Sequence, residues 1–225
     1  MIQAVLFDMD GVLLDTERLG REIMIRACAQ RGYAFSPELY ISILGCTQEL
    51  SRRILADTFG PAFPYEEIMR QFHQELLQIA LADGLPVKPG LLACMEGLKA
   101  RGVRRALATS TARPIVEKYM ARLPLMQNCF DAMVCGAEGG RSKPEPDIYL
   151  EAARRLGLAP GDCLGVEDSL NGLRSLTAAG CVSVMIPDLL PYNESLAGVV
   201  KHRLSDLGQV CALIDRINAG ARARA

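Results

Sequence analysis

The possible folds of this chain are limited above all by five short apolar runs that alternate with segments of helical periodicity. The runs lack the polar alternation of a half-exposed strand, so each predicts a strand buried on both faces. They cover residues 2–7, 103–108, 132–135, 163–166 and 181–186, and the helical patterns between them cover 91–100, 113–121, 148–156 and 170–179. This order predicts an α/β fold, a Rossmann-like parallel sheet with helices on both faces.

One connection is too long to be a single crossover helix. It runs from Asp8 to Val103, and much of it has helical spacing, at residues 19–30, 48–59 and 65–81. We interpret residues 16–86 as an inserted all-helical cap domain, and residues 1–15 and 87–225 as the α/β catalytic core. The prolines and the glycine of the stretch PVKPG favour a hinge where the chain returns to the core.

Composition narrows the range of partners. A formal net charge of -1 over 225 residues gives no electrostatic reason to expect nucleic acid. No run approaches the ~20 apolar residues of a membrane span, and the first residues show no basic leader. The cysteines are scattered without a CxxC pair, which favours reduced thiols over a disulfide framework or a zinc site. We expect a cytoplasmic monomer with no nucleic-acid and no membrane partner.

Polar residues follow four of the predicted strands. They are Asp8 and Asp10 after the first, residues 109–111 after the second, Lys143 in the loop after the third, and Glu167 and Asp168 after the fourth. In open α/β sheets ligands bind outside the carboxyl ends of the strands, so these side chains should meet. Crowded carboxylates require a cation, and oxygen ligands suit a hard ion such as Mg²⁺. Such an ion, a lysine and hydroxyl donors are what a phosphoryl group needs for charge neutralisation and positioning.

Four motifs in this order resemble those of the haloacid dehalogenase-like hydrolases. They are FDMDGVLLDTE at the first strand, the hydroxyl of Thr109, the lysine in SKPEPDIY, and VEDS with NG following. The similarity is greatest to the branch that contains β-phosphoglucomutase and small sugar-phosphate phosphatases. It covers the whole chain, since the insertion has the place and size of that branch's helical cap. The resemblance implies a Mg²⁺-dependent phosphatase acting on a small phosphorylated metabolite, a sugar or polyol phosphate.

The resemblance also implies a role for each motif residue. Asp8 is expected to attack phosphorus and form an aspartyl-phosphate. Asp10 is expected to protonate the leaving oxygen and then to deprotonate the attacking water. Thr109 should hydrogen-bond a phosphoryl oxygen, and Lys143 should neutralise the charge of the transferred group. The implied metal ligands are Asp8, the carbonyl of Asp10, Asp168 and Glu167, the last directly or through water.

Residues around these motifs are candidates for contact with substrate. The set comprises Met9, Gly11, Thr16, Glu17, Ser110, Thr111 and Gln48. Gly11 allows a tight turn, so that amides near Met9 and Asp10 can face the phosphoryl oxygens. For the hydroxyl residues of the set, helix capping is an alternative. Gln48 belongs to a cap loop of small, neutral hydrogen-bonding groups that suits a polyol or sugar phosphate.

Two other functions fit parts of the pattern. A β-phosphoglucomutase-type sugar phosphomutase shares the motifs, but that enzyme carries a histidine after the first motif and an arginine in the first cap loop. An ungapped count places Gly20 and Gln48 at those positions, and both departures favour a hydrolase. A non-catalytic binding or regulatory module would require a broken catalytic set, whereas the set in this sequence is intact.

Overall fold

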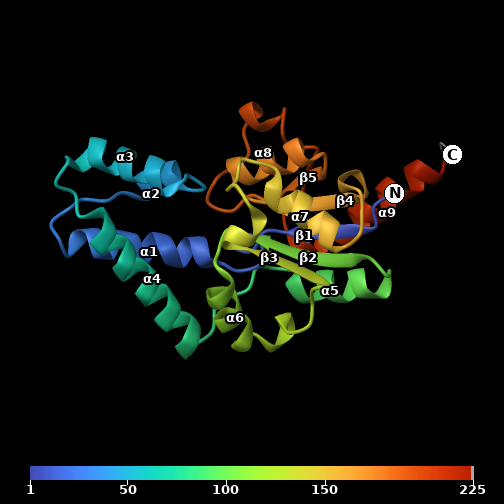
Figure 1. The fold of residues 1–225 in the computed structure, drawn as a ribbon, viewed down its shortest axis with the longest axis horizontal. Helices are drawn as coiled ribbons and strands as arrows, with labels where there is room; N and C mark the ends of the chain where they lie inside the picture. Colours follow the sequence, from blue (N-terminus) through green and yellow to red (C-terminus); the bar gives the residue numbers. More distant parts are fainter. Residues whose placement is uncertain (224–225) are drawn as a thin grey trace.

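A parallel sheet forms the centre of the computed structural model, which describes residues 1–223 (Figure 1). Its strands are β1 (Ala4–Phe7), β2 (Arg104–Thr109), β3 (Ala132–Cys135), β4 (Cys163–Glu167), β5 (Val182–Met185) and β6 (His202–Arg203). They lie in the order β3-β2-β1-β4-β5-β6, and every neighbouring pair is parallel. In such a doubly wound sheet the strand order reverses beside β1, and ligands bind outside the carboxyl ends at that point.

Helices cover both faces of the sheet. One face carries α5 (Leu91–Ala100), α6 (Arg113–Ala121) and α9 (Val210–Arg222), and the other carries α7 (Asp147–Arg155) and α8 (Leu170–Ala179). Successive side chains of a strand point to opposite faces. Accordingly, Val5 and Phe7 of β1 join the hydrophobic cluster of the first face. Ala4 and Leu6 join the cluster of the second. β1 is therefore buried throughout, and it fixes the residues that follow it.

Four helices between β1 and α5 form a separate group, here called the helical lobe (residues 16–82), at the left of Figure 1. They are α1 (Thr16–Ala29), α2 (Pro37–Ile43), α3 (Gln48–Phe59) and α4 (Tyr65–Ala82). The lobe has its own buried cluster, which includes Met24, Leu55 and Ile68. Its two connections to the sheet run side by side, because Leu14 and Val87 form a β-bridge. The lobe thus stands beside the carboxyl end of β1.

The predicted fold class is confirmed. Every strand and helix predicted from the sequence is present, with ends displaced by at most three residues. Two further α-helices, α2 and α9, the short strand β6 and five short 3-10 helices were not predicted. All eight cysteines are free, as expected. Within the described residues, no helix combines the length and the hydrophobicity that a membrane crossing requires.

Candidate active site

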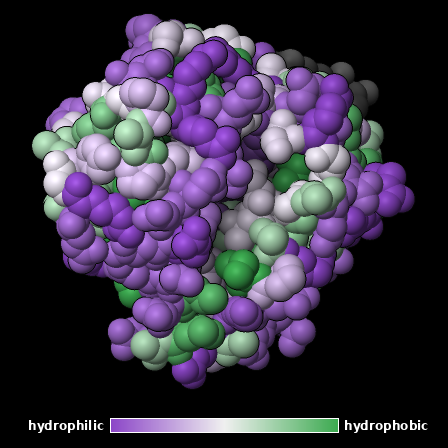
Figure 2. Space-filling model, turned by 60° about the vertical axis from the view of Figure 1, so that its left-hand side comes forward, coloured by the Kyte–Doolittle hydropathy of each residue, from purple (hydrophilic) through white to green (hydrophobic). Residues whose placement is uncertain are grey.

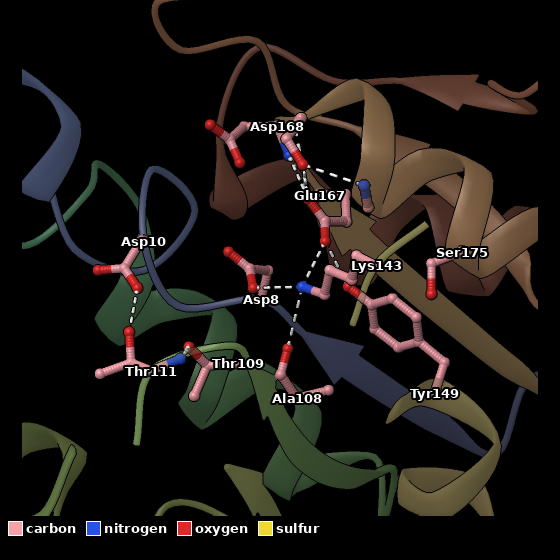
Figure 3. A network of polar contacts seen from close by, with 12 residues as sticks. Asp8, Asp10, Ala108, Thr109, Thr111, Lys143, Tyr149, Glu167, Asp168 and Ser175 are labelled. Atoms are coloured by element: carbon pink, nitrogen blue, oxygen red, sulfur yellow. Dashed lines mark hydrogen bonds and ion pairs between the residues drawn. The ribbon is translucent and has the colours of Figure 1, made fainter. Parts of the chain in front are cut away.

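A lysine whose side chain is only 9% exposed joins two carboxylates at the carboxyl edge of the sheet (Figure 3). The Nζ atom of Lys143 lies 2.6 Å from Oδ1 of Asp8 and 2.7 Å from Oε1 of Glu167. It also donates to the carbonyl of Ala108 at 3.3 Å. Burial opposes the charge of this lysine, but the two carboxylates outweigh it and raise its pKa above the usual range. Lys143 is therefore a permanent cation between β1 and β4.

The Glu167 carboxylate, fully buried, is saturated with hydrogen bonds. Besides Lys143, its Oε1 accepts from the hydroxyl of Tyr149, at 2.5 Å. Its Oε2 accepts from the backbone amides of Asp168 and Ser169 and from the Ser169 hydroxyl. Tyr149 was not among the predicted site residues, because only the lysine of the stretch SKPEPDIY was given a role and the tyrosine that ends it lies on the apolar face of α7. The contacts show that Glu167 holds Lys143 in place and has little capacity left for a direct metal bond.

Gly172 on α8 is needed for this arrangement, because a Cβ there would overlap the Glu167 carboxylate. We expect Gly172→Ala to lower the free energy of unfolding by about 1–3 kcal/mol, the usual cost of overpacking a buried site. Gly161 is a matched control, since a Cβ there meets open space. Urea unfolding of both variants tests this, and Gly161→Ala should stay within about 0.5 kcal/mol of the parent protein. Equal stabilities of the two variants would contradict the proposed role of Gly172.

Two hydroxyl groups donate hydrogen bonds to the two carboxylate oxygens of Asp10. Thr16 donates to its Oδ1 and Thr111 to its Oδ2, each at 2.8 Å. Burial raises the pKa of Asp10, and the two hydroxyls partly oppose that shift. Thr16 belongs to the helical lobe and Thr111 follows β2, so Asp10 lies between the lobe and the sheet. Thr109 is fully buried, and its Oγ1 accepts from the Thr111 amide at 3.1 Å.

Three acidic side chains converge at the same carboxyl edge of the sheet. Carboxylate oxygens of Asp8, Glu167 and Asp168 lie within 4.8 Å of one another, close enough to hold a metal ion. Burial, opposed by Lys143, raises the pKa of Asp8 to about 7. Burial and then the Glu167 charge raise the pKa of Asp168 well above its usual range. Gly11, at a φ of 76°, permits this crowding, since a Cβ there would overlap the Asp168 carboxylate. A cation would relieve the repulsion.

A cleft of about 1020 Å³ opens above these residues, between the lobe and the edge of the sheet. Asp8, Asp10, Lys143 and Asp168 line it from the sheet. Figure 2, in which the lobe comes forward, shows a mostly hydrophilic face that is hollowed near its centre. The cleft is far larger than a phosphate group needs. It can therefore hold the organic part of a phosphorylated molecule.

The predicted substrate contacts divide into two groups. Glu17, Gln48 and Ser110 line the cleft, and the other four candidates do not. Met9 is fully buried, and the hydroxyls of Thr16 and Thr111 point to Asp10. Gln48 opens α3 next to the cleft-lining loop of residues 44–47, as expected of a cap loop. Burial and the nearby Asp10 raise the pKa of Glu17 to about 8.

Comparisons with known proteins identify the family of this chain. A model of the haloacid dehalogenase-like hydrolases matches residues 2–180. The chain is 32% identical over 205 residues to a phosphorylated carbohydrates phosphatase of Thermotoga maritima, covering 91% of this chain and 88% of that protein. It is 35% identical over 187 residues to a probable pseudouridine-5'-phosphatase of Drosophila melanogaster, covering 81% and 80%. The crystal structure of CbbY from Rhodobacter sphaeroides in complex with phosphate superposes with a TM-score of 0.75 at 28% identity, covering 93% and 96%.

Proposed function

Since the chain belongs to the haloacid dehalogenase-like hydrolase family, we propose that it is a Mg²⁺-dependent phosphatase that hydrolyses a small sugar or polyol phosphate through an aspartyl-phosphate. The contact of Lys143 with Asp8 at the floor of the cleft is the observation that carries this proposal. A cation of this kind keeps a carboxylate ionised as a nucleophile and attracts a phosphoryl group. The similarity to a phosphorylated carbohydrates phosphatase supports the substrate class.

The proposed hydrolysis proceeds in two steps. In the first, Oδ2 of Asp8, the oxygen that Lys143 does not contact, attacks phosphorus, the ester P–O bond breaks, and Asp10 gives its proton to the leaving oxygen. In the second, Asp10 takes a proton from water as the water oxygen attacks phosphorus, and Asp8 is released with inorganic phosphate. The raised pKa of Asp10 supports an acid role in the first step. The hydrogen bonds from Thr16 and Thr111 keep the Asp10 carboxyl directed toward the cleft in both steps.

The backbone after β1 supports phosphoryl binding. Within residues 1–223 the amides of Met9 and Asp10 donate no hydrogen bond, although Met9 itself is buried. Buried amides are normally paired, so unpaired ones beside a nucleophile are suited to bind the oxygens of a phosphoryl group. Met9 would act through its amide rather than its side chain. Thr109 would act through the loop it orders, because its hydroxyl accepts from the Thr111 amide.

Asp8, Asp168 and the carbonyl of Asp10 are the residues that would hold Mg²⁺. The fit rests on the cluster of carboxylate oxygens and on the raised pKa values of Asp8 and Asp168. Glu167 would act through water, given the hydrogen bonds it already accepts. When bound, the ion would supply positive charge that offsets the negative charge of the phosphoryl group.

Thermal unfolding with and without Mg²⁺ tests this site. A carboxyl whose pKa rises on folding binds more protons in the folded state, so folding stability falls as pH rises from about 4 to about 7. Protons and Mg²⁺ compete for Asp8 and Asp168. We therefore expect saturating Mg²⁺ to raise Tm by several degrees at pH 8 and by clearly less at pH 6. Asp168→Asn should lose most of the shift at pH 8, and an equal shift at both pH values would contradict the assignment.

Phosphate release from sugar, polyol and nucleotide monophosphates with Mg²⁺ tests the function as a whole. The proposal predicts turnover of hexose or hexitol phosphates, with nucleotides slower. Conversion of a hexose phosphate to its isomer with a bisphosphate primer, without phosphate release, would establish the phosphomutase instead. If the protein turned over none of these substrates, the remaining alternative would be a non-catalytic binding or regulatory module. Gly20, where a mutase-type histidine would stand, supports the hydrolase.

The proposal also includes the division of the chain into two domains. We propose residues 16–86 as a cap domain on a catalytic core of residues 1–15 and 87–225. The cluster formed by α1, α2, α3 and α4 supports a separate cap. A cap over the cleft would exclude water during phosphoryl transfer. The protein is proposed to act as a cytoplasmic monomer on a small phosphorylated metabolite.

A further inference from the structure

Two cysteines meet in the core of the sheet face that carries α5, α6 and α9. Cys94 lies on α5 and Cys211 on α9, 117 residues apart in sequence, and both belong to the buried cluster of that face. The Cys211 thiol donates to the carbonyl of Cys94 at 3.8 Å. The Cys94 thiol is itself a hydrogen-bond donor to the Cys211 sulfur. The two side chains are thus in contact, although neither has a part in the proposed phosphoryl chemistry.

Gly97 lets the two helices approach each other. It follows Cys94 by three residues, on the same side of α5, and a Cβ there would overlap the Cys211 sulfur. Four residues further along each segment, Arg101 forms an ion pair with Asp215 of α9 at 2.8 Å. A disulfide needs such a close approach, because its two Cα atoms lie about 4.4–6.8 Å apart.

The two thiols differ in acidity and in access. The hydrogen bond from Cys94 lowers the pKa of Cys211 to about 7 against the effect of burial, and the charge of Arg101 adds to the shift. The same hydrogen bond, together with burial, raises the pKa of Cys94. The Cys211 residue is 9% exposed, whereas Cys94 is 1% exposed. Cys211 is therefore the thiolate that a small oxidant reaches first, and Cys94 is the thiol beside it.

We propose that Cys94 and Cys211 form an oxidation site, at which a hydroperoxide converts the two thiols to a disulfide between α5 and α9. With H₂O₂, the Cys211 thiolate attacks one oxygen, the O–O bond breaks, hydroxide leaves, and Cys211 becomes a sulfenic acid. Cys94 then attacks the Cys211 sulfur, the S–O bond breaks, and the Cys94 proton leaves with the hydroxyl group as water. Overall the two thiols lose two electrons and two protons, and H₂O₂ is reduced to two molecules of water.

The disulfide stabilises the place where the chain returns from the lobe to the sheet. α5 starts directly after the stretch PVKPG, and the Leu207 amide, shortly before α9, donates to the carbonyl of Pro89 at 3.3 Å. A link between residues 117 positions apart removes much conformational entropy from the unfolded chain. Oxidation should therefore raise Tm by several degrees, and dithiothreitol should reverse the rise.

The test treats the folded, reduced protein with a small excess of H₂O₂ and then counts free thiols with DTNB in denaturant. We expect the loss of two of the eight thiols and a peptide map that links Cys94 to Cys211. Cys94→Ala should prevent the link and leave on Cys211 a sulfenic acid that dimedone traps. Cys163→Ala is the matched control and should still lose two thiols. Cys163 is buried in one cluster with Cys181, but burial raises the pKa of both thiols.

Eight free thiols after oxidation of the wild type would overturn the proposal. A link between other cysteines, or between two copies of the chain, would do the same, as would a sulfinic acid on Cys211 without a disulfide. An oxidised protein whose Tm does not rise would overturn the stabilising role of the link. These measurements need no turnover, so their failure is distinct from a failure of the proposed phosphatase.

Discussion

Asp8→Asn is expected to abolish phosphate release, with a fall in kcat of roughly 10⁴-fold or more. The neutral amide is a far weaker nucleophile than the carboxylate, and the neighbouring carboxylates have other roles in the site. Asp10 is held by two hydroxyls, and Lys143 and Tyr149 hold Glu167. Phosphate release measured on the best substrate of the panel gives the result directly.

The same variant separates chemistry from folding. Asn has the shape of Asp, and Lys143 keeps its contact with Glu167, so Tm should change little. Asp57→Asn is the control, because Asp57 is exposed on α3 and makes no ion pair within the described residues. Acid-quenched wild-type protein should carry one phosphoryl group on the peptide that contains Asp8. A variant that retained a tenth of wild-type kcat would exclude Asp8 as nucleophile.

Most of the sheet and its edge could be predicted because burial on both faces leaves a simple sequence pattern. β1 is apolar throughout and ends directly before Asp8. The pattern that predicts the strand therefore also locates the first residue of the site. Two of the unpredicted elements, β6 and α2, lack such marks. β6 has two residues, and α2 has seven and starts with a proline. α9 did carry a signal, the helical spacing of Val210, Leu213 and Ile214, which join the core.

The contacts that refine the site could not be predicted, because they join segments distant in sequence. Tyr40 reaches Glu17 across 23 residues, and Tyr149 reaches Glu167 across 18. Tyr40 lies outside the motifs, and Tyr149 ends the stretch SKPEPDIY, in which only the lysine had an expected role. Contacts between distant segments also bear on Glu167, which the resemblance implied as a metal ligand, directly or through water. Only the folded chain shows that its oxygens already serve Lys143, Tyr149 and the start of α8.

Lys143→Met is expected to lower kcat about 10²- to 10³-fold. Met keeps the length of the side chain but removes the charge that faces Asp8 and the incoming phosphoryl group. Substrate affinity should fall as well, because the cation beside the three aspartates of the cleft is then lost. Lys99→Met is the control, since Lys99 is exposed on α5 and forms no ion pair within the described residues. A Lys143→Met variant with more than a tenth of wild-type kcat would refute this role.

The effect of Lys143→Met on stability should depend on pH. Removing one partner of a buried ion pair costs about 3–5 kcal/mol, because the remaining charge has no counter-ion. Below pH 7 Asp8 escapes this cost by taking a proton, since burial already raises its pKa to about 7 and loss of Lys143 raises it further. The loss in Tm relative to wild type, measured without Mg²⁺, should therefore be larger at pH 8 than at pH 6. An equal loss at both values would mean that Lys143 stabilises the fold by packing, and that its charge is not what Asp8 and Glu167 require.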